Sequence, residues 1–433
     1  MAFSSLYRMP NIRRLPDDVR AGSMSGSCAQ VVRRPPVLLG AALVASGWTA
    51  LYSCVIWLLE FVTAPMHDDV RLYYVAAEAG LRYGWSTIYD QGALRSVSSS
   101  FPAAARLIDE KTYASTPLLA WVFAPMTVFP ETVAYVLWVL LSVTALVIAW
   151  HISAPYDALA KITLLLLAIG AGPVLLTMYF GQPTLIVLAL SATAWWLLVK
   201  NRDMEAGAAL SLAMFLKPQA VILLPVALLV SRRYRAVVAW AAVSAALALL
   251  TVLTLGSTGL TEWWHVVQRV QRLPIDTIFT LAGPVSDRPL TYALWLIQGA
   301  MALWIAWARR RELEIVFAAG ILGTVATASY FHNSDYCVLV LAGWLVLRTS
   351  PPLWHRLWLL VGVLTMQLLL TPLLAAPQLL WDGAWLAILA IGTLPMLHVP
   401  AMPFQLLAPI RDADKAARVR PRSRSAARLA PPR

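Results

Sequence analysis

The chain has 433 residues, of which 60% are hydrophobic and only 13% charged, and its mean hydropathy is +0.68. A soluble domain is about half apolar and a quarter charged, so this chain has too few charges to coat the two or three soluble domains that its length would imply. Its repeated apolar runs of roughly 15 to 25 residues instead indicate a polytopic membrane protein.

The net charge is +12, from 34 basic and 22 acidic residues, and the basic surplus lies mainly in the segments 1–36 and 401–433. Both segments flank apolar stretches. We therefore expect basic ends that stay in the cytoplasm and contact anionic lipid headgroups, with the lipid bilayer and no nucleic acid as partner. The last segment is rich in Arg, Ala and Pro, which predicts a disordered tail. The three cysteines form no motif and imply neither disulfides nor a metal site.

The first apolar run, Val37–Val62, is too long for a cleavable signal peptide and is predicted to be a signal anchor leading out of the cytoplasm. A polar segment, 63–115, follows as a first extracytoplasmic loop. The next stretch, Pro117–Phe129, is short and bounded by prolines, so we expect it to be re-entrant.

Three full spans are predicted next, at Glu131–Ile152, Lys161–Tyr179 and Thr184–Val199. The following stretch, Ala206–Val230, has basic clusters on both sides and the pair Lys217-Pro218 in its middle. It satisfies the positive-inside rule if it enters the membrane and returns as a hairpin, with Lys217 at the turn, deep in the membrane.

After a span at Ala236–Leu255, the segment 256–289 is predicted to form a second large extracytoplasmic loop. The remaining predicted spans are Leu290–Ala308, Glu312–Tyr330, Tyr336–Leu347, Leu357–Leu374 and Ala384–His398. The sequence thus predicts an all-α membrane helix bundle over residues 37–400, with about ten full spans, one broken-helix hairpin and both termini in the cytoplasm.

This topology brings four polar stretches to the outer side: Asp68-Asp69, Gly181-Gln182, Lys217, and His332 through Asp335. Ionisable residues within or near a membrane are functional candidates by default. Each stretch also has an ordinary structural interpretation, such as helix capping for the aspartates, snorkelling for Lys217 and mutual pairing for His332 and Asp335.

One reaction would use such a set. A carboxylate can accept the proton of a hydroxyl that attacks an anomeric carbon, while a fixed cation such as Lys217 stabilises a departing lipid phosphate. A donor used on the outer side would be lipid-linked, and the chain carries no Walker-type phosphate-binding loop.

Several motifs resemble glycosyltransferase family 87, the polyprenol-phosphate-sugar-dependent transferases often described as alpha-1,2-mannosyltransferases. The resemblance rests on the order and spacing of these motifs. The motifs are Asp69 through Ala77, Gly84, Tyr89-Asp90, Tyr113–Pro130, Gly181 through Thr184, Ala206-Gly207, Leu216 through Pro218, and Tyr330 through Tyr336. It implies a membrane-embedded GT-C fold and an extracytoplasmic active site. It also implies an aspartate base four residues before a tyrosine, which selects Asp69 before Tyr73 and leaves Asp68 as the second choice.

The resemblance also suggests substrate-binding residues. It assigns Lys217 to the donor phosphate and His332 to the phosphate or the acceptor. Further candidates for substrate contacts are Gln182, Tyr73, Asp335, Arg269 and Arg272. The chain departs from the family pattern after Gly181-Gln182, where Pro183 and Thr184 stand in place of a common asparagine.

The sequence therefore predicts an inverting membrane glycosyltransferase. It would move a hexose, with mannose favoured, from a polyprenyl-phosphate sugar to a hydroxyl of a cell-envelope glycolipid or polysaccharide, outside a bacterial cytoplasmic membrane. No metal or other cofactor is expected. The alternatives are another lipid-linked sugar donor such as arabinofuranose, a flippase or transporter of lipid-linked sugars, and a catalytically dead scaffold.

Overall fold

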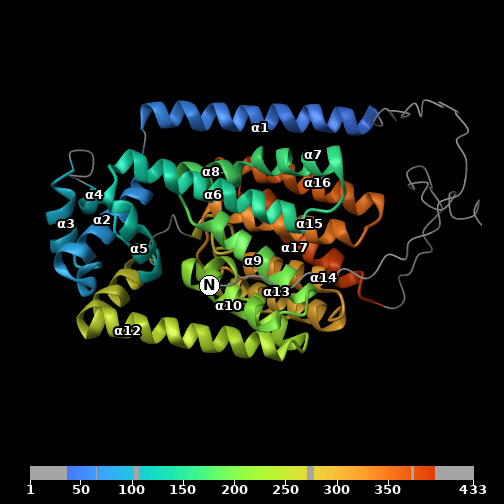
Figure 1. Cartoon of the computed structure of the whole chain (residues 1–433). Coiled ribbons are helices and arrows are strands. Elements are labelled where there is room, and N and C mark those ends of the chain that lie inside the picture. Colours follow the sequence, from blue (N-terminus) through green and yellow to red (C-terminus); the bar gives the residue numbers. More distant parts are fainter. Residues whose placement is uncertain (1–36, 65, 102–106, 271–276, 372–374, 395–433) are drawn as a thin grey trace, which may run out of the picture.

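The computed structural model describes residues 37–64, 66–101, 107–270, 277–371 and 375–394, and within these ranges the chain forms helices and no strand. Two long helices, α1 (Val37–Thr63) and α12 (Tyr234–Val270), lie along opposite sides of a helical bundle (Figure 1). Their apolar surfaces are largely exposed, which is typical of helices that face lipid. The predicted basic segments 1–36 and 401–433 lie outside the described residues.

The predicted first loop is largely helical and, together with the two helices after it, packs at one end of the bundle (Figure 1). This cap comprises α2 (Asp68–Tyr83), η1 (Trp85–Thr87), α3 (Gln91–Ser98), α4 (Leu107–Glu110), α5 (Pro117–Phe123) and η3 (Ala124–Val128). Leu72 through Ala77 of α2 are all buried, so this helix is covered on every side in its middle, and its packing partners include α3, α5 and η3. The short pair α5 and η3 agrees with the expectation of a non-spanning Pro117–Phe129.

Among the described residues, four helices are long and apolar enough to cross a membrane: α1, α6 (Glu131–Ser153), α12 and α13 (Arg288–Ala308). The expected full span Lys161–Tyr179 is not one continuous helix, because α7 (Ala158–Ile169) and α8 (Gly172–Phe180) meet at 57°. The break falls at Gly170 and Ala171, just before Pro173, where a continuing helix would be disfavoured. If this bent pair counts as one span, the described part of the chain holds five candidate spans.

The expected break at Lys217-Pro218 is confirmed. Helix α10 (Asp203–Leu216) ends at Lys217, whose backbone is extended, and the chain resumes through η4 (Pro218–Ala220) and α11 (Leu224–Val230). Pro218 lacks the N–H that a continuous helix would need.

The predicted end of a span at Leu255 coincides with a kink at Gly256, whose backbone is not helical, so the label α12 covers two helices. The second of them runs to Val270, so the first part of the predicted loop 256–289 is helical and packs against η1. The kink requires a φ of +60° at Gly256, a conformation that favours glycine.

The remaining helices are α9 (Thr184–Val199), α14 (Leu313–Ala326), η6 (Asn333–Cys337), α15 (Val338–Arg348), α16 (Leu353–Leu368) and α17 (Ala375–Ile391). Helix α17 begins before the expected start at Ala384 and includes Asp382, which is buried and accepts a 2.7 Å hydrogen bond from Gln378. The expected ten full spans are not confirmed, since α9, α14 and α17 are shorter than a bilayer core normally requires. The expected orientation of the termini is not confirmed either, because residues 1–36 and 395–433 lie outside the described part of the chain.

Candidate functional site

The turn that joins α8 to α9 directs Gln182 toward the cap. Gly181 ends α8 in the left-handed conformation, with φ +64° and ψ +33°. A Cβ at this position would lie 1.8 Å from Cγ2 of Val70 on α2, so only glycine lets the two segments approach this closely. The Gly181 carbonyl also accepts a 2.7 Å hydrogen bond from Nε1 of Trp138, which fixes the turn to α6.

The first turn of α2 carries Asp69 at the boundary between cap and bundle. His67 caps this helix: its Nδ1 accepts a 3.2 Å hydrogen bond from the backbone N–H of Asp69. The imidazole packs against the rings of Tyr179 and Phe180. This burial lowers the pKa of His67, although the charge of Asp69 opposes the shift. A neutral His67 is the form that can cap the helix.

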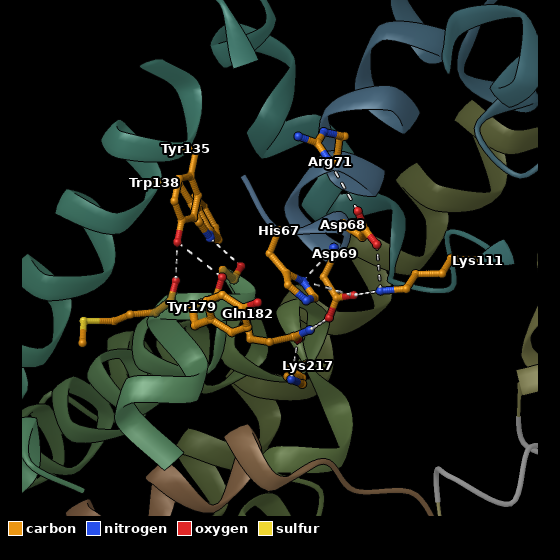
Figure 2. A network of polar contacts seen from close by, with 12 residues as sticks. His67, Asp68, Asp69, Arg71, Lys111, Tyr135, Trp138, Tyr179, Gln182 and Lys217 are labelled. Atoms are coloured by element: carbon orange, nitrogen blue, oxygen red, sulfur yellow. Dashed lines mark hydrogen bonds and ion pairs between the residues drawn. The ribbon is translucent and has the colours of Figure 1, made fainter. Parts of the chain in front are cut away.

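Gln182 connects Asp69 to the bundle interior (Figure 2). Its Nε2 donates to Oδ2 of Asp69 at 2.7 Å, and its Oε1 accepts from Nζ of Lys217 at 2.8 Å. Both polar atoms of the Gln182 side-chain amide are therefore hydrogen-bonded.

Lys217 lies behind Gln182 and is almost completely buried, with 5% of its side chain exposed. Its ammonium forms an ion pair with Oδ1 of Asp335 and donates to Oγ1 of Thr184 at 3.1 Å. With the bond to Gln182, all three N–H groups of Lys217 are engaged. Because Thr184 also donates to Asp335 at 3.1 Å, the buried charges are paired and hydrogen-bonded, as a low-dielectric interior requires.

The open side of the site carries a different cation. The Nζ of Lys111, which follows α4, lies 3.3 Å from Oδ2 of Asp68 and 3.6 Å from Oδ1 of Asp69, and 38% of its side chain is exposed (Figure 2). Asp68 is itself 40% exposed and lies 3.4 Å from Arg71. The two oxygens of Asp69 thus face different surroundings: Oδ2 contacts Gln182 and Oδ1 faces Lys111.

The four stretches that the sequence placed together do meet through side-chain contacts, from Asp69 through Gln182 and Lys217 to Asp335. His332 adjoins this chain, because its backbone N–H donates to Oδ2 of Asp335 at 3.1 Å. Asp335 is fully buried and in direct contact with Lys217, so it acts here as the partner of a cation.

The other three candidates are not part of these contacts. Tyr73 is buried in the cap, where its ring packs against Tyr113 and Phe123, and burial raises the pKa of its hydroxyl. Arg269 is exposed and makes no hydrogen bond or ion pair with any residue in the described part of the chain. Arg272 lies outside the described residues.

Sequence reasoning overlooked three side chains of the site: His67, Lys111 and Thr184. Thr184 belongs to the Pro183-Thr184 pair at which the sequence departs from the family resemblance, yet its hydroxyl contacts both Lys217 and Asp335. Lys111 is one of five basic residues in the predicted loop 63–115, so its position gave little to distinguish it from the others. His67 takes the capping position that the sequence suggested for an aspartate, and histidine is not a usual N-cap residue, so its position alone did not indicate this role.

Together these contacts give a carboxylate at a partly open boundary, one exposed cation beside it and a buried cation behind it. Such a set can accept a proton from a hydroxyl and stabilise negative charge nearby. No curated protein and no solved structure matches the chain. The family profile of glycosyltransferase family 87 matches residues 113–331, which is half of the chain and includes Gln182 and Lys217. The chain therefore belongs to glycosyltransferase family 87 and is a glycosyltransferase with membrane helices.

Proposed function

We propose that the protein transfers a hexose, mannose in the first instance, from a polyprenyl-phosphate sugar to a hydroxyl of a cell-envelope glycolipid or polysaccharide. The site would lie on the outer face of a bacterial cytoplasmic membrane. Family membership supports glycosyl transfer, and the apolar helices support a lipid-linked donor that diffuses within the bilayer.

The observation that carries the proposal is the position of Asp69. Its Oδ2 is held by Gln182, while Oδ1 faces the open side, where 29% of the side chain is exposed. We assign Oδ1 as the atom that takes the acceptor's proton as the acceptor oxygen attacks the anomeric carbon. Attack by the acceptor itself, in a single displacement, inverts the anomeric configuration.

The departing lipid phosphate needs a cation that can reach it. Lys217 would reach it only by giving up one of its three contacts, whereas Lys111 is partly exposed on the side of Oδ1. We therefore propose that Lys111 contacts the donor phosphate, whereas Lys217 stays behind the site and does not contact the donor. His332 lies at the rim of the same cluster and is proposed to contact the phosphate or the acceptor.

The donor is tested with a panel of labelled lipids. Purified full-length protein would be incubated with polyprenyl-phosphate-mannose or polyprenyl-phosphate-arabinofuranose and with octyl mannoside or a bacterial glycolipid extract as acceptor. Transfer of label from the mannosyl donor, with inverted configuration at the new linkage by NMR, is the expected result. Transfer from the arabinofuranosyl donor alone would replace the sugar in this proposal. Movement of the donor lipid across the membrane of reconstituted vesicles, without any glycosidic product, would refute glycosyl transfer and favour a flippase.

A further inference from the structure

Gln182 can hold Asp69 in only one way. Lysine carries three donors and no acceptor, so only Oε1 of Gln182 can face Nζ of Lys217. The Nε2 group must then face Oδ2 of Asp69, which an ionised carboxylate accepts. A flipped amide would set N–H against ammonium and carbonyl against carboxylate, which are two repulsive contacts in place of two hydrogen bonds.

Lys217 is in turn held by the bundle. Its other two N–H groups are taken by Asp335 and Thr184, and Asp335 is tied to its own loop by the N–H of His332. Gln182 is fixed from the backbone side as well, because its N–H donates to the carbonyl of Thr177 at 2.9 Å. The amide therefore has both its position and its orientation determined by buried groups.

We propose that Gln182 is a positioning residue, oriented by the Lys217–Asp335 ion pair, that holds Oδ2 of Asp69 so that Oδ1 faces the acceptor. This inference rests on the proposed role of Asp69 as the base. It gives Lys217 a function that does not require contact with the donor: its ammonium fixes which end of Gln182 faces the carboxylate. It also explains why Lys217, Thr184 and Asp335 are fully paired with one another behind the site.

The first test separates positioning from substrate binding. Gln182→Met has a side chain of similar length and no hydrogen-bonding groups at the two contact positions. A misplacement of about 1 Å at a reacting group can cost about 100-fold in rate, so Gln182→Met should lower kcat by about 10- to 100-fold. The KM for polyprenyl-phosphate-mannose should stay within about twofold, since Gln182 touches Asp69 and not the proposed donor cation. A wild-type kcat in Gln182→Met would overturn the inference.

A second variant keeps the test decisive if Gln182→Met does not fold. Gln182→Glu preserves shape and can still accept from Lys217, but it sets a second carboxyl oxygen against Oδ2 of Asp69. Two carboxylates in contact cannot both stay ionised, so one must bind a proton or Asp69 must move. We expect a loss of kcat at least as large as in Gln182→Met, in a protein that still folds because the side-chain shape and the contact with Lys217 are kept. Wild-type activity in Gln182→Glu would contradict the proposed orientation.

The third test asks whether Lys217 acts through Gln182. Lys217→Met alone leaves the carboxylate of Asp335 buried and unpaired, so the matched variant is the double substitution Lys217→Met/Asp335→Asn, which removes both charges together. If the ion pair acts by orienting Gln182, the double variant should show the kcat loss of Gln182→Met. Adding Gln182→Met to it should then cost less than a further threefold, because groups that act as a unit are not additive. Independent losses that multiply would refute the connection.

Asp69→Asn, measured alongside, separates the two levels of the proposal. Full activity in Asp69→Asn would remove the base and with it the proposed mechanism. An inactive Asp69→Asn beside a fully active Gln182→Met would leave Asp69 as the base and refute only the positioning role.

Discussion

Gly181→Ala is the substitution whose cost can be worked out most directly from the structure. Gly181 has φ +64°, and the methyl group of an alanine there would lie 1.8 Å from Cγ2 of Val70 and 3.3 Å from Cβ of Val70. A non-glycine residue in the left-handed region costs about 1–2 kcal/mol. Overpacking of a well-filled interior costs about 1–3 kcal/mol. The sum predicts that Gly181→Ala lowers the free energy of unfolding by about 2–5 kcal/mol.

The two contributions can be separated with Val70→Ala, which removes the methyl group that the new Cβ would meet. The double variant Gly181→Ala/Val70→Ala should be more stable than the sum of the two single losses predicts, by about 1–3 kcal/mol, because the overpacking is gone while the backbone strain remains. Transfer activity should fall in Gly181→Ala as well, since Gln182 is the next residue.

The assay is unfolding of the purified protein in detergent micelles by titration with sodium dodecyl sulfate, with transfer measured on the same preparations. Gly343→Ala is the matched control: a Cβ at Gly343 meets nothing within 4 Å, and that position lies inside α15. Alanine is the better helix former, so the control should lose no stability. Equal stability of Gly181→Ala and the wild type would refute the proposed close approach of α2 to the α8–α9 turn.

Two further predictions concern His67 and Lys111. Because burial lowers the pKa of His67 below its ordinary value of 6.5, the unfolded chain binds more protons at low pH, and stability should be lost as pH falls below about 6.5. Unfolding measured between pH 5 and 8 should show this loss in the wild type and less of it in His67→Asn, which keeps a side-chain oxygen for the cap and does not titrate. Lys111→Met should lower kcat by about 100-fold, the usual cost of removing one group that stabilises developing charge. The control is Arg95→Met, which removes a cation of the same cap whose ion-pair partner among the described residues is the exposed Asp109. Equal rates in the two variants would contradict the assignment of Lys111 to the phosphate.

Local signals in the sequence predicted much of the fold. The long apolar runs indicated the helices α1, α6, α12 and α13, and Lys217-Pro218 indicated the break after α10. The bend between α7 and α8 was missed because its apolar pattern is uninterrupted, and only Gly170 through Pro173 signals it. The predicted span Ala384–His398 begins after Asp382, whereas α17 begins at Ala375 and includes this acid. Its partner Gln378 lies one turn earlier on the same helix, a pairing that hydropathy does not record.

For the site as well, the sequence indicated individual residues but not the contacts between distant segments. The candidates Asp69, Gln182, Lys217 and Asp335 could be selected as polar residues near apolar segments. The contacts between these residues could not be predicted, since the hydrogen bond from Gln182 to Asp69 joins residues that are 113 positions apart in the sequence. Lys217 could be recognised as a buried cation, but its charge is already paired with Asp335, and that pairing depends on how η6 packs against α8 and α9. Lys111, the more exposed cation, was hidden in a loop whose folding could not be predicted.

The central claim is that Asp69 is the base of a glycosyl transfer, and it is tested most directly by comparing Asp69→Asn with Asp68→Asn. Both substitutions remove one negative charge beside Lys111, so they match in charge and location. Radiolabelled mannose from polyprenyl-phosphate-mannose would be followed into glycolipid product in membranes bearing each protein. Loss of a general base costs about 100- to 10,000-fold, so Asp69→Asn should lose nearly all transfer while Asp68→Asn stays within about threefold of the wild type. Wild-type transfer by Asp69→Asn together with loss in Asp68→Asn would contradict the account and move the base to the neighbouring carboxylate.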